Sequence, residues 1–306
     1  MMQLLDDYLT LRRAAGFKLR GAECRLRRFV RFAEDRGDTH VRVDTAVAWA
    51  GTAHSPHDRS VRLQELALFA RHLRAEDARH EIPPPQVFAF KHHKRLPYIY
   101  SDEDIRRLLE AAGERHRRPG DSMGDTYRTM LGLIAVTGIR VGEAVSLLVR
   151  DVTDRVLFIR ETKFRKSRMV PLHETVAVQI SAFANRWRVT AGPDEPFFVS
   201  TLGRRLSGTR VNEVFRQLTD ELGLTLPAEE GRYPGPRIHD LRHTFAVRAL
   251  ESCPEGRAEI NRHMLALSTY LGHSSTESTY WYLHVTPQLM TDIADACEAW
   301  HVRGAQ

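Results

Sequence analysis

The chain of 306 residues contains only three cysteines, and no two of them are close together in the sequence. Cys24, Cys253 and Cys297 are odd in number and have no metal-binding spacing, so we expect no disulfide framework and a reducing, cytoplasmic setting. No apolar run is long enough to cross a membrane. The N-terminal segment has early acidic residues and lacks the apolar core of a signal peptide.

Low-complexity tracts and internal repeats are also absent. A hydrophobic content of 42% and a charged content of 27% are typical of an ordinary folded protein, and the length allows two domains. The charges are uneven in sign, because 45 Lys and Arg residues oppose 39 Asp and Glu residues, for a net charge of +6. This excess favours an anionic partner without identifying one.

The basic residues are concentrated in one N-terminal stretch. Leu26, Phe29, Val30 and Ala33 recur there at helical spacing, which predicts an amphipathic helix. The rest of its surface is strongly basic, with a single acid, Glu23, among six cations: Lys18, Arg20, Arg25, Arg27, Arg28 and Arg31. Such a face is either simply solvated or bound to phosphates, and the stretch alone does not decide between them.

The chain divides at a proline-rich, basic stretch. Residues 1–82 carry apolar residues at helical spacing and predict an all-helical domain. Residues 83–97 begin with three consecutive prolines, which cannot continue a helix, and include the basic run KHHKR. Ser101 and Asp104 then form a capping-box pattern, so we expect a second domain over residues 98–306.

The second domain is predicted to be mainly helical with a small β-sheet. Residues 125–137 predict a helix, and Val141 to Leu148 a further one. The segment VLFIRETKFRKSRMVPL predicts a β-hairpin with a charged tip, and residues 197–199 one more strand. Helices dominate from residue 210 onward, so the fold class is mainly α with an α+β second domain.

The segment HDLRHTFAVRAL predicts a helix with two different faces. Leu241, Phe245 and Ala249 fall on one side and could anchor it, whereas His239, Arg242, His243 and Ala246 fall on the other. Two histidines four residues apart also occur in zinc proteases, but the acid between them here is Asp240 rather than Glu. A zinc site would need a third ligand such as His263 or His273, so it is the weaker hypothesis.

Four motifs in order make a more specific pattern: TGIRVGEAVSLLVRDV, TKFRKSRMVPL, HDLRHTFAVRAL and LGHSSTESTYWYLHV. Together they resemble the tyrosine recombinases, the phage integrase family, over roughly residues 98–290. The resemblance is to site-specific recombinases carried by transposons in particular. It implies a helical, SAM-like core-binding domain before a catalytic domain that cuts and rejoins DNA through a 3′-phosphotyrosyl intermediate.

The resemblance implies a role for each motif. Arg140 and Arg242 would hold the non-bridging oxygens of the scissile phosphate, because guanidinium forms two parallel hydrogen bonds to such a group. Lys163 on the hairpin would protonate the leaving 5′-hydroxyl, and His239 would help to deprotonate the tyrosine, whose phenol has a pKa of about 10. His273 would add a hydrogen bond to the phosphate. No metal or other cofactor is needed.

The nucleophile implied by the resemblance is Tyr282, which lies nine residues after His273 and is followed by Leu283 and His284. Tyr280 is the alternative and is more typical of packing. On the hairpin, the shared Arg168 to Leu172 register places Lys163 at the catalytic position but leaves Lys166 open. Arg140 could instead serve only as an ion-pair partner of Glu143, which resembles the structural acid of the family.

The expected partner is double-stranded DNA carrying a specific site. Its expected contacts are Lys18, Arg20, Arg25, Arg28, Lys91, Lys94, Arg95, Lys166 and Arg168. Residues 287–300 carry apolar side chains at helical spacing, so they either complete their own core or, as in the family, dock on a neighbouring protomer in a tetramer. Accessory recombinases, a type IB topoisomerase-like activity and a non-catalytic DNA-binding protein are the alternatives left open.

Overall fold

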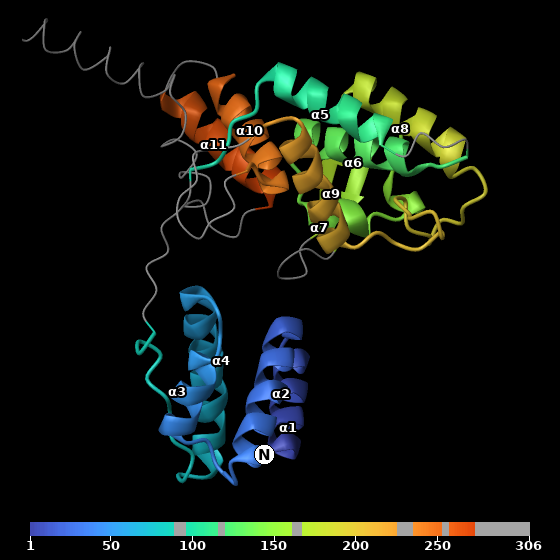
Figure 1. Ribbon diagram of the computed structural model, residues 1–306. Helices are drawn as coiled ribbons and strands as arrows, with labels where there is room; N and C mark the ends of the chain where they lie inside the picture. The colour runs from blue at the N-terminus through green and yellow to red at the C-terminus, as the bar shows by residue number, and fades with distance from the viewer. Residues whose placement is uncertain (89–95, 116–119, 161–166, 225–234, 253–256, 273–306) are drawn as a thin grey trace, which may run out of the picture. The chain divides into compact units, whose positions relative to one another are not determined.

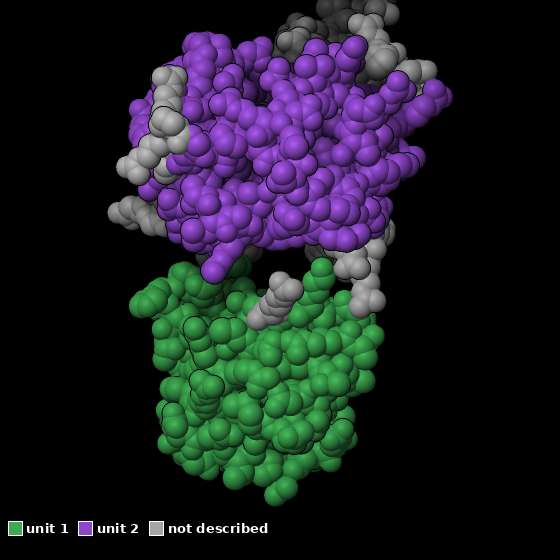
Figure 2. Space-filling view, turned by 90° about the vertical axis from the view of Figure 1, so that its right-hand side faces the viewer, with its two compact units in different colours: residues 1–94 green, residues 95–306 purple. Residues whose placement is uncertain are grey.

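The computed structural model describes residues 1–88, 96–115, 120–160, 167–224, 235–252 and 257–272. The chain forms two compact units, Met1–Lys94 and Arg95–Gln306, which Figure 2 shows in green and purple. Figure 1 labels the helices of both units. No helix in the described parts of the chain is long and apolar enough to cross a membrane.

The described part of the first unit, residues 1–88, forms four helices: α1 (Met2–Ala14), α2 (Arg20–Asp35), α3 (Val43–Gly51) and α4 (Pro56–Glu76). Ser55 caps α4 by accepting a hydrogen bond from the Asp58 amide at 3.0 Å, and Pro56 occupies the first turn, where its missing N–H costs nothing. Aromatic pairs join the helices in the core, because Tyr8 meets Phe69 across α1 and α4, and Phe29 meets Trp49 across α2 and α3. The apolar stripe predicted along residues 26–33 faces this core.

The second unit is mainly helical with one small sheet. Its elements are α5 (Asp102–Glu114), α6 (Met123–Thr137), α7 (Val141–Ser146), β1 (Val156–Ile159), β2 (Arg168–Pro171), α8 (Glu174–Trp187), α9 (Gly208–Glu221), α10 (Ile238–Glu251) and α11 (Arg257–Leu271). The capping box predicted at the start of α5 is confirmed, because Ser101 and Asp104 each accept the other's amide hydrogen at 3.0 Å.

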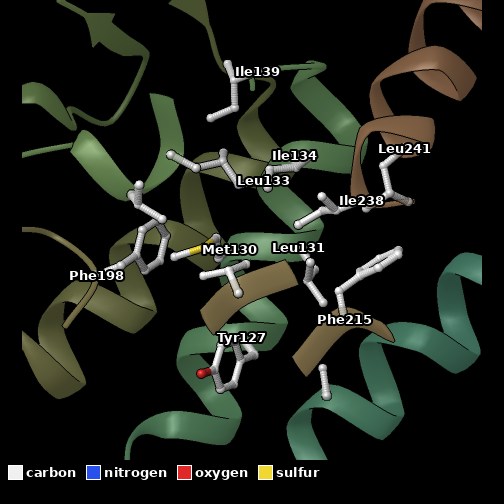
Figure 3. Packing of buried hydrophobic residues seen from close by; sticks show 14 of the residues in the cluster. Tyr127, Met130, Leu131, Leu133, Ile134, Ile139, Phe198, Phe215, Ile238 and Leu241 are labelled. Carbon is white, nitrogen blue, oxygen red and sulfur yellow. The ribbon is translucent and has the colours of Figure 1, made fainter. Parts of the chain in front are cut away.

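Helix α6 lies at the centre of the second core. Tyr127, Met130, Leu131 and Ile134 along this helix are buried, and they pack among Phe198, Phe215 and Ile238 from later segments (Figure 3). Trp187 of α8 also donates a hydrogen bond to Asp125 of α6 at 2.8 Å. Because so much of the core packs on α6, the residues at its C-terminal end have a fixed position.

The predicted hairpin is confirmed, and the extra strand is wrong. β1 and β2 pair antiparallel with Leu157 opposite Val170, and both of these side chains are buried. Around residues 197–199 the described chain makes only isolated bridges, through Pro196 and Val199. Phe197 and Phe198 are both buried in the core, whereas successive side chains of a strand point to opposite faces.

The predicted two-faced character of α10 is also wrong. Arg242 and His243 are buried along with Leu241, and Ala246 is fully buried. Helix α10 packs against α6 and α11, so it is enclosed on more than one side. Arg242 tolerates burial because its guanidinium has carbonyl partners there.

Gly138 ends α6 in the left-handed conformation, with φ of +62°. A Cβ at this position would lie 2.5 Å from a ring carbon of Phe245 and 3.2 Å from a methyl carbon of Leu271. Glycine therefore lets α6 end directly against α10 and α11.

We predict that Gly138→Ala destabilises the second unit by about 2 kcal/mol or more, through left-handed strain and overpacking. Gly142→Ala is the matched control, because a Cβ there meets nothing within 4 Å and the position is helical. It should be neutral or slightly stabilising. Urea unfolding of both variants checks this, and equal stability of the two would contradict it.

Candidate active site

Arg242 joins three helices through buried hydrogen bonds. Its side chain comes from α10 and the residue is only 1% exposed. One terminal nitrogen donates to the Gly138 carbonyl at 2.6 Å, and the other donates to the Leu271 carbonyl at 2.7 Å. The ends of α6 and α11 therefore fix this guanidinium, which is what electrostatic preorganisation requires.

Arg140 lies at the start of α7 and reaches the same carbonyl as Arg242. Its terminal nitrogens lie 3.5 Å from the Leu271 oxygen and 3.4 Å from the Gly272 oxygen, both long contacts. Its side chain is 35% exposed, so solvent and a ligand can reach it. The two arginines expected to bind phosphate are thus brought together from segments about a hundred residues apart in the sequence.

Glu143 holds Arg140 in place. One carboxylate oxygen accepts from the Arg140 backbone amide and the other from the Arg140 guanidinium, each at 2.9 Å. Burial would raise the pKa of Glu143, but hydrogen bonds from Arg168 and from the Arg140 amide outweigh it and lower the pKa. Because its pKa is lowered, Glu143 is ionised and forms an ion pair with Arg140. Arg140 also contacts the end of α11.

His239 is the third expected catalytic group and lies in the first turn of α10. The residue is exposed at the surface, and its imidazole meets that of His243 edge to face, with ring centroids 4.6 Å apart. Desolvation by the surrounding protein, followed by the charges of Arg242, Arg237 and Arg140, lowers the pKa of His239 to about 4. A neutral imidazole can accept a proton, as a general base must.

The zinc hypothesis has no support from His263, whose Nε2 donates to the Ala249 carbonyl at 2.6 Å. Within the described residues, the one group with metal-like spacing is His40, Asp77 and His80 in the first unit. Nδ1 of His80 accepts the Val41 amide hydrogen at 3.0 Å, so the proton of the neutral ring is on Nε2. That ring offers no free lone pair, and we assign no metal to it.

Tyr270 also lies near the arginines, in the last turn of α11. Its ring stacks on Phe245 with centroids 5.5 Å apart, and its backbone carbonyl accepts a hydrogen bond from Arg168. Burial raises the pKa of Tyr270 to about 12, against the smaller effects of Arg168 and Arg242. Such a phenol is poorly suited to be a nucleophile, and its stacking gives it a packing role.

Several expected site residues lie outside the described residues: Lys91, Lys94, Arg95, Lys163, Lys166, His273, Tyr280 and Tyr282. Of the others, Lys18 and Arg28 are exposed and have no ion pair with any residue that the structure describes. Arg20 begins α2, and its side chain is not described. Arg25 forms a two-pronged ion pair with Glu65, at 2.7 and 2.6 Å, so its guanidinium already has a partner.

Arg168 was expected on DNA, but its surroundings differ from those of a surface contact. Its side chain is 12% exposed, and its guanidinium donates to both oxygens of Glu143 at 3.0 and 2.7 Å. The sequence could not indicate this, because Glu143 lies 25 positions away and nothing local marks the pair. The hairpin register that places Arg168 opposite Ile159 is what brings it to Glu143.

Comparisons with known proteins agree with this arrangement. The phage integrase family profile matches residues 98–288. The chain is 37% identical over 304 residues to y4rB of Sinorhizobium fredii, an inferred integrase/recombinase, covering 95% of this chain and 94% of that one. It is 30% identical over 250 residues to the tyrosine recombinase XerD of Rhizobium meliloti, covering 80% and 75%.

Solved structures share the fold at low sequence identity. A lambda integrase dimer bound to a core site has a TM-score of 0.61 at 19% identity, covering 90% of this chain and 96% of that one. The Tn1549 transposon integrase in complex with transposon end DNA also has a TM-score of 0.61, at 17% identity, covering 91% and 94%. The chain belongs to the phage integrase family, and it is a tyrosine recombinase.

We predict that His239 stays neutral well below the usual histidine pKa of about 6.5, because desolvation by the surrounding protein disfavours its charged form and the guanidiniums of Arg242, Arg237 and Arg140 oppose a further positive charge. NMR titration of the imidazole resonances, with His239→Asn used for assignment, measures this in the DNA-free protein. The expected titration midpoint lies below pH 5.5, toward the pKa of about 4. A midpoint at or above about 6.5 would contradict this view of the site.

Proposed function

We propose that this recombinase cuts and rejoins DNA at a specific site, with Tyr282 as the nucleophile and the ends of a mobile element as substrate. The observation that carries the proposal is the convergence of Arg140 and Arg242 on the Leu271 carbonyl, beside a His239 whose pKa is low. Two guanidiniums and a neutral imidazole in one place suit attack on a phosphodiester.

The proposed reaction needs no external energy source. The phenol oxygen of Tyr282 forms a bond to the scissile phosphorus, and the bond from phosphorus to the 5′-oxygen breaks. His239 takes the phenol proton, and Lys163 supplies a proton to the leaving 5′-oxygen. Arg140 and Arg242 stabilise the charge on the non-bridging oxygens, with His273 as a further donor. In rejoining, a 5′-hydroxyl of another strand loses its proton to Lys163 and bonds to the phosphorus. The bond from phosphorus to the Tyr282 oxygen breaks, and His239 returns the proton to the phenol.

The first unit is proposed to bind DNA beside the cleavage point. Lys18 and Arg28 remain available for phosphates, whereas Arg25 and Arg27 are occupied by Glu65 and by Asp6 with Glu23. We therefore place the contact at Lys18 and on the exposed part of α2 rather than over the whole basic stretch. Lys91, Lys94, Arg95 and Lys166 stay candidates for the same role by charge alone.

The proposed assembly is a tetramer on DNA. One of the similar solved structures is a lambda integrase tetramer bound to a Holliday junction, with a TM-score of 0.58, covering 90% of this chain and 77% of that one. The relation to the Tn1549 transposon integrase supports a mobile element as the source of the DNA site. Accessory recombinases remain a hypothesis from the sequence.

We predict that Tyr282→Phe abolishes the covalent protein–DNA adduct on a nicked substrate from the ends of the element, because the phenol oxygen is the attacking atom. Tyr280→Phe and Tyr270→Phe are the matched controls and should still form the adduct. Denaturing gel electrophoresis measures the product. Loss of the adduct in Tyr280→Phe but not in Tyr282→Phe would move the nucleophile by two residues.

The same preparation separates a recombinase from a topoisomerase-like enzyme. A supercoiled plasmid without the cognate site should stay supercoiled, since cleavage is proposed to depend on the site. Rapid relaxation of that plasmid would favour the topoisomerase-like alternative.

We predict that a chain ending at Pro287 binds its site but does not form tetramers, because the apolar helical pattern of residues 287–300 is proposed to dock on a neighbouring protomer. Analytical ultracentrifugation of the protein–DNA complex measures the stoichiometry. Tetramers formed by the truncated chain would show that this segment serves its own core.

A further inference from the structure

Each of the three guanidinium nitrogens of Arg168 donates a hydrogen bond to a protein acceptor. Its two terminal nitrogens donate to the two oxygens of Glu143, and its Nε donates to the Tyr270 carbonyl at 2.8 Å. This is the parallel, two-pronged geometry that Arg forms with a carboxylate and Lys cannot. Three of the five N–H donors of the guanidinium are bound in this way, and the side chain is only 12% exposed.

Glu143 receives four hydrogen bonds, two from Arg168 and two from Arg140. Its side chain is 9% exposed, so its charge depends on these partners. The guanidiniums of Arg140 and Arg168 both bind this carboxylate, so two positive charges share one negative charge. Without Arg168, Arg140 would be the one guanidinium of the described residues left to neutralise the buried charge of Glu143.

Arg168 also lies against the end of α11. Gly272 has φ of +67°, and a Cβ there would lie 3.0 Å from a terminal nitrogen of Arg168. The guanidinium therefore fills the space beside the residue that directly precedes His273 in the sequence. The carbonyls of Tyr270, Leu271 and Gly272 accept hydrogen bonds from Arg168, Arg242 and Arg140, which suits the negative end of a helix.

We propose that Arg168 is a positioning residue for the cleavage reaction, acting through Glu143 and the end of α11 on Arg140, and that it is not a DNA contact. The proposal rests on the function proposed above. Arg168 is the first residue of β2, the strand that follows Lys163 in the sequence, so it ties this strand to the helix end that holds the two arginines proposed to bind phosphate. Misplacing such groups by about 1 Å can slow a reaction on the order of 100-fold.

Single-turnover cleavage and DNA affinity in Arg168→Ala separate positioning from phosphate binding. Positioning predicts a cleavage rate at saturating DNA about 100-fold below wild type, with an unchanged salt dependence of the affinity. A lost phosphate contact predicts instead a salt slope smaller by about one, with a nearly unchanged saturated rate. Arg28→Ala is the positive control for a reduced slope, because Arg28 is an exposed candidate contact.

Combining Arg168→Ala with a substitution of Arg140 tests whether Arg168 acts through Arg140. Arg140→Lys keeps a charge at the site and should retain a measurable rate. If Arg168 acts through Arg140, adding Arg168→Ala to Arg140→Lys slows cleavage by less than about 3-fold, since coupled sites are not additive. A further loss of about 100-fold in the double variant would show an independent role and overturn the proposal.

Arg168→Lys is a second, milder variant that keeps the proposal testable if Arg168→Ala fails to fold. It keeps a positive charge beside Glu143 but loses the two-pronged bond, so positioning predicts a rate loss of about 10-fold with a wild-type salt slope. A wild-type rate in this variant and in Arg168→Ala would overturn the proposal. Absence of any adduct with the wild-type protein would instead be a failure of the proposed function, which is distinguishable from all these outcomes.

Discussion

The negative end of α11 is the constraint on which the rest of the site depends. A helix leaves its last carbonyls without partners inside the helix, and a buried end must find donors elsewhere. Here the donors are guanidiniums from α10, from the start of α7 and from β2. Each of these arginines is itself charged and needs partners, so one arrangement satisfies the helix end and fixes the cations.

The surrounding packing maintains that arrangement. Helix α6 is the centre of the core. Its C-cap is Gly138, where only glycine allows the close approach of Phe245. Arg242 then bridges Gly138 and Leu271, so a displacement of α6 or α11 would move a proposed phosphate-binding group directly. A buried ion pair contributes little net stability compared with apolar packing. The pair between Arg168 and Glu143 does fix the direction of both side chains through its two parallel hydrogen bonds.

The sequence was informative where a local pattern carries the structure. Helical patterns predicted α2 and α6, a capping box predicted the start of α5, and β-favouring runs around a charged tip predicted the hairpin. Motif order predicted the family and brought Arg140, His239 and Arg242 into one hypothesis. The sequence was uninformative where the structure depends on distant partners. Phe197 and Phe198 suggested a strand by composition, yet both rings are buried in the core. Arg168 looked like any hairpin cation, because its partner Glu143 is reached only after folding.

The most direct test of the account is a crystal structure of Tyr282→Phe bound to its DNA site before cleavage. The account predicts that Arg140 and Arg242 both lie about 3 Å from the non-bridging oxygens of the scissile phosphate. It also predicts that Arg242 keeps its bond to the Leu271 carbonyl and that Arg168 stays on Glu143. A structure in which Arg168 leaves Glu143 to bind the phosphate, or in which Arg242 does not reach the phosphate, would contradict it.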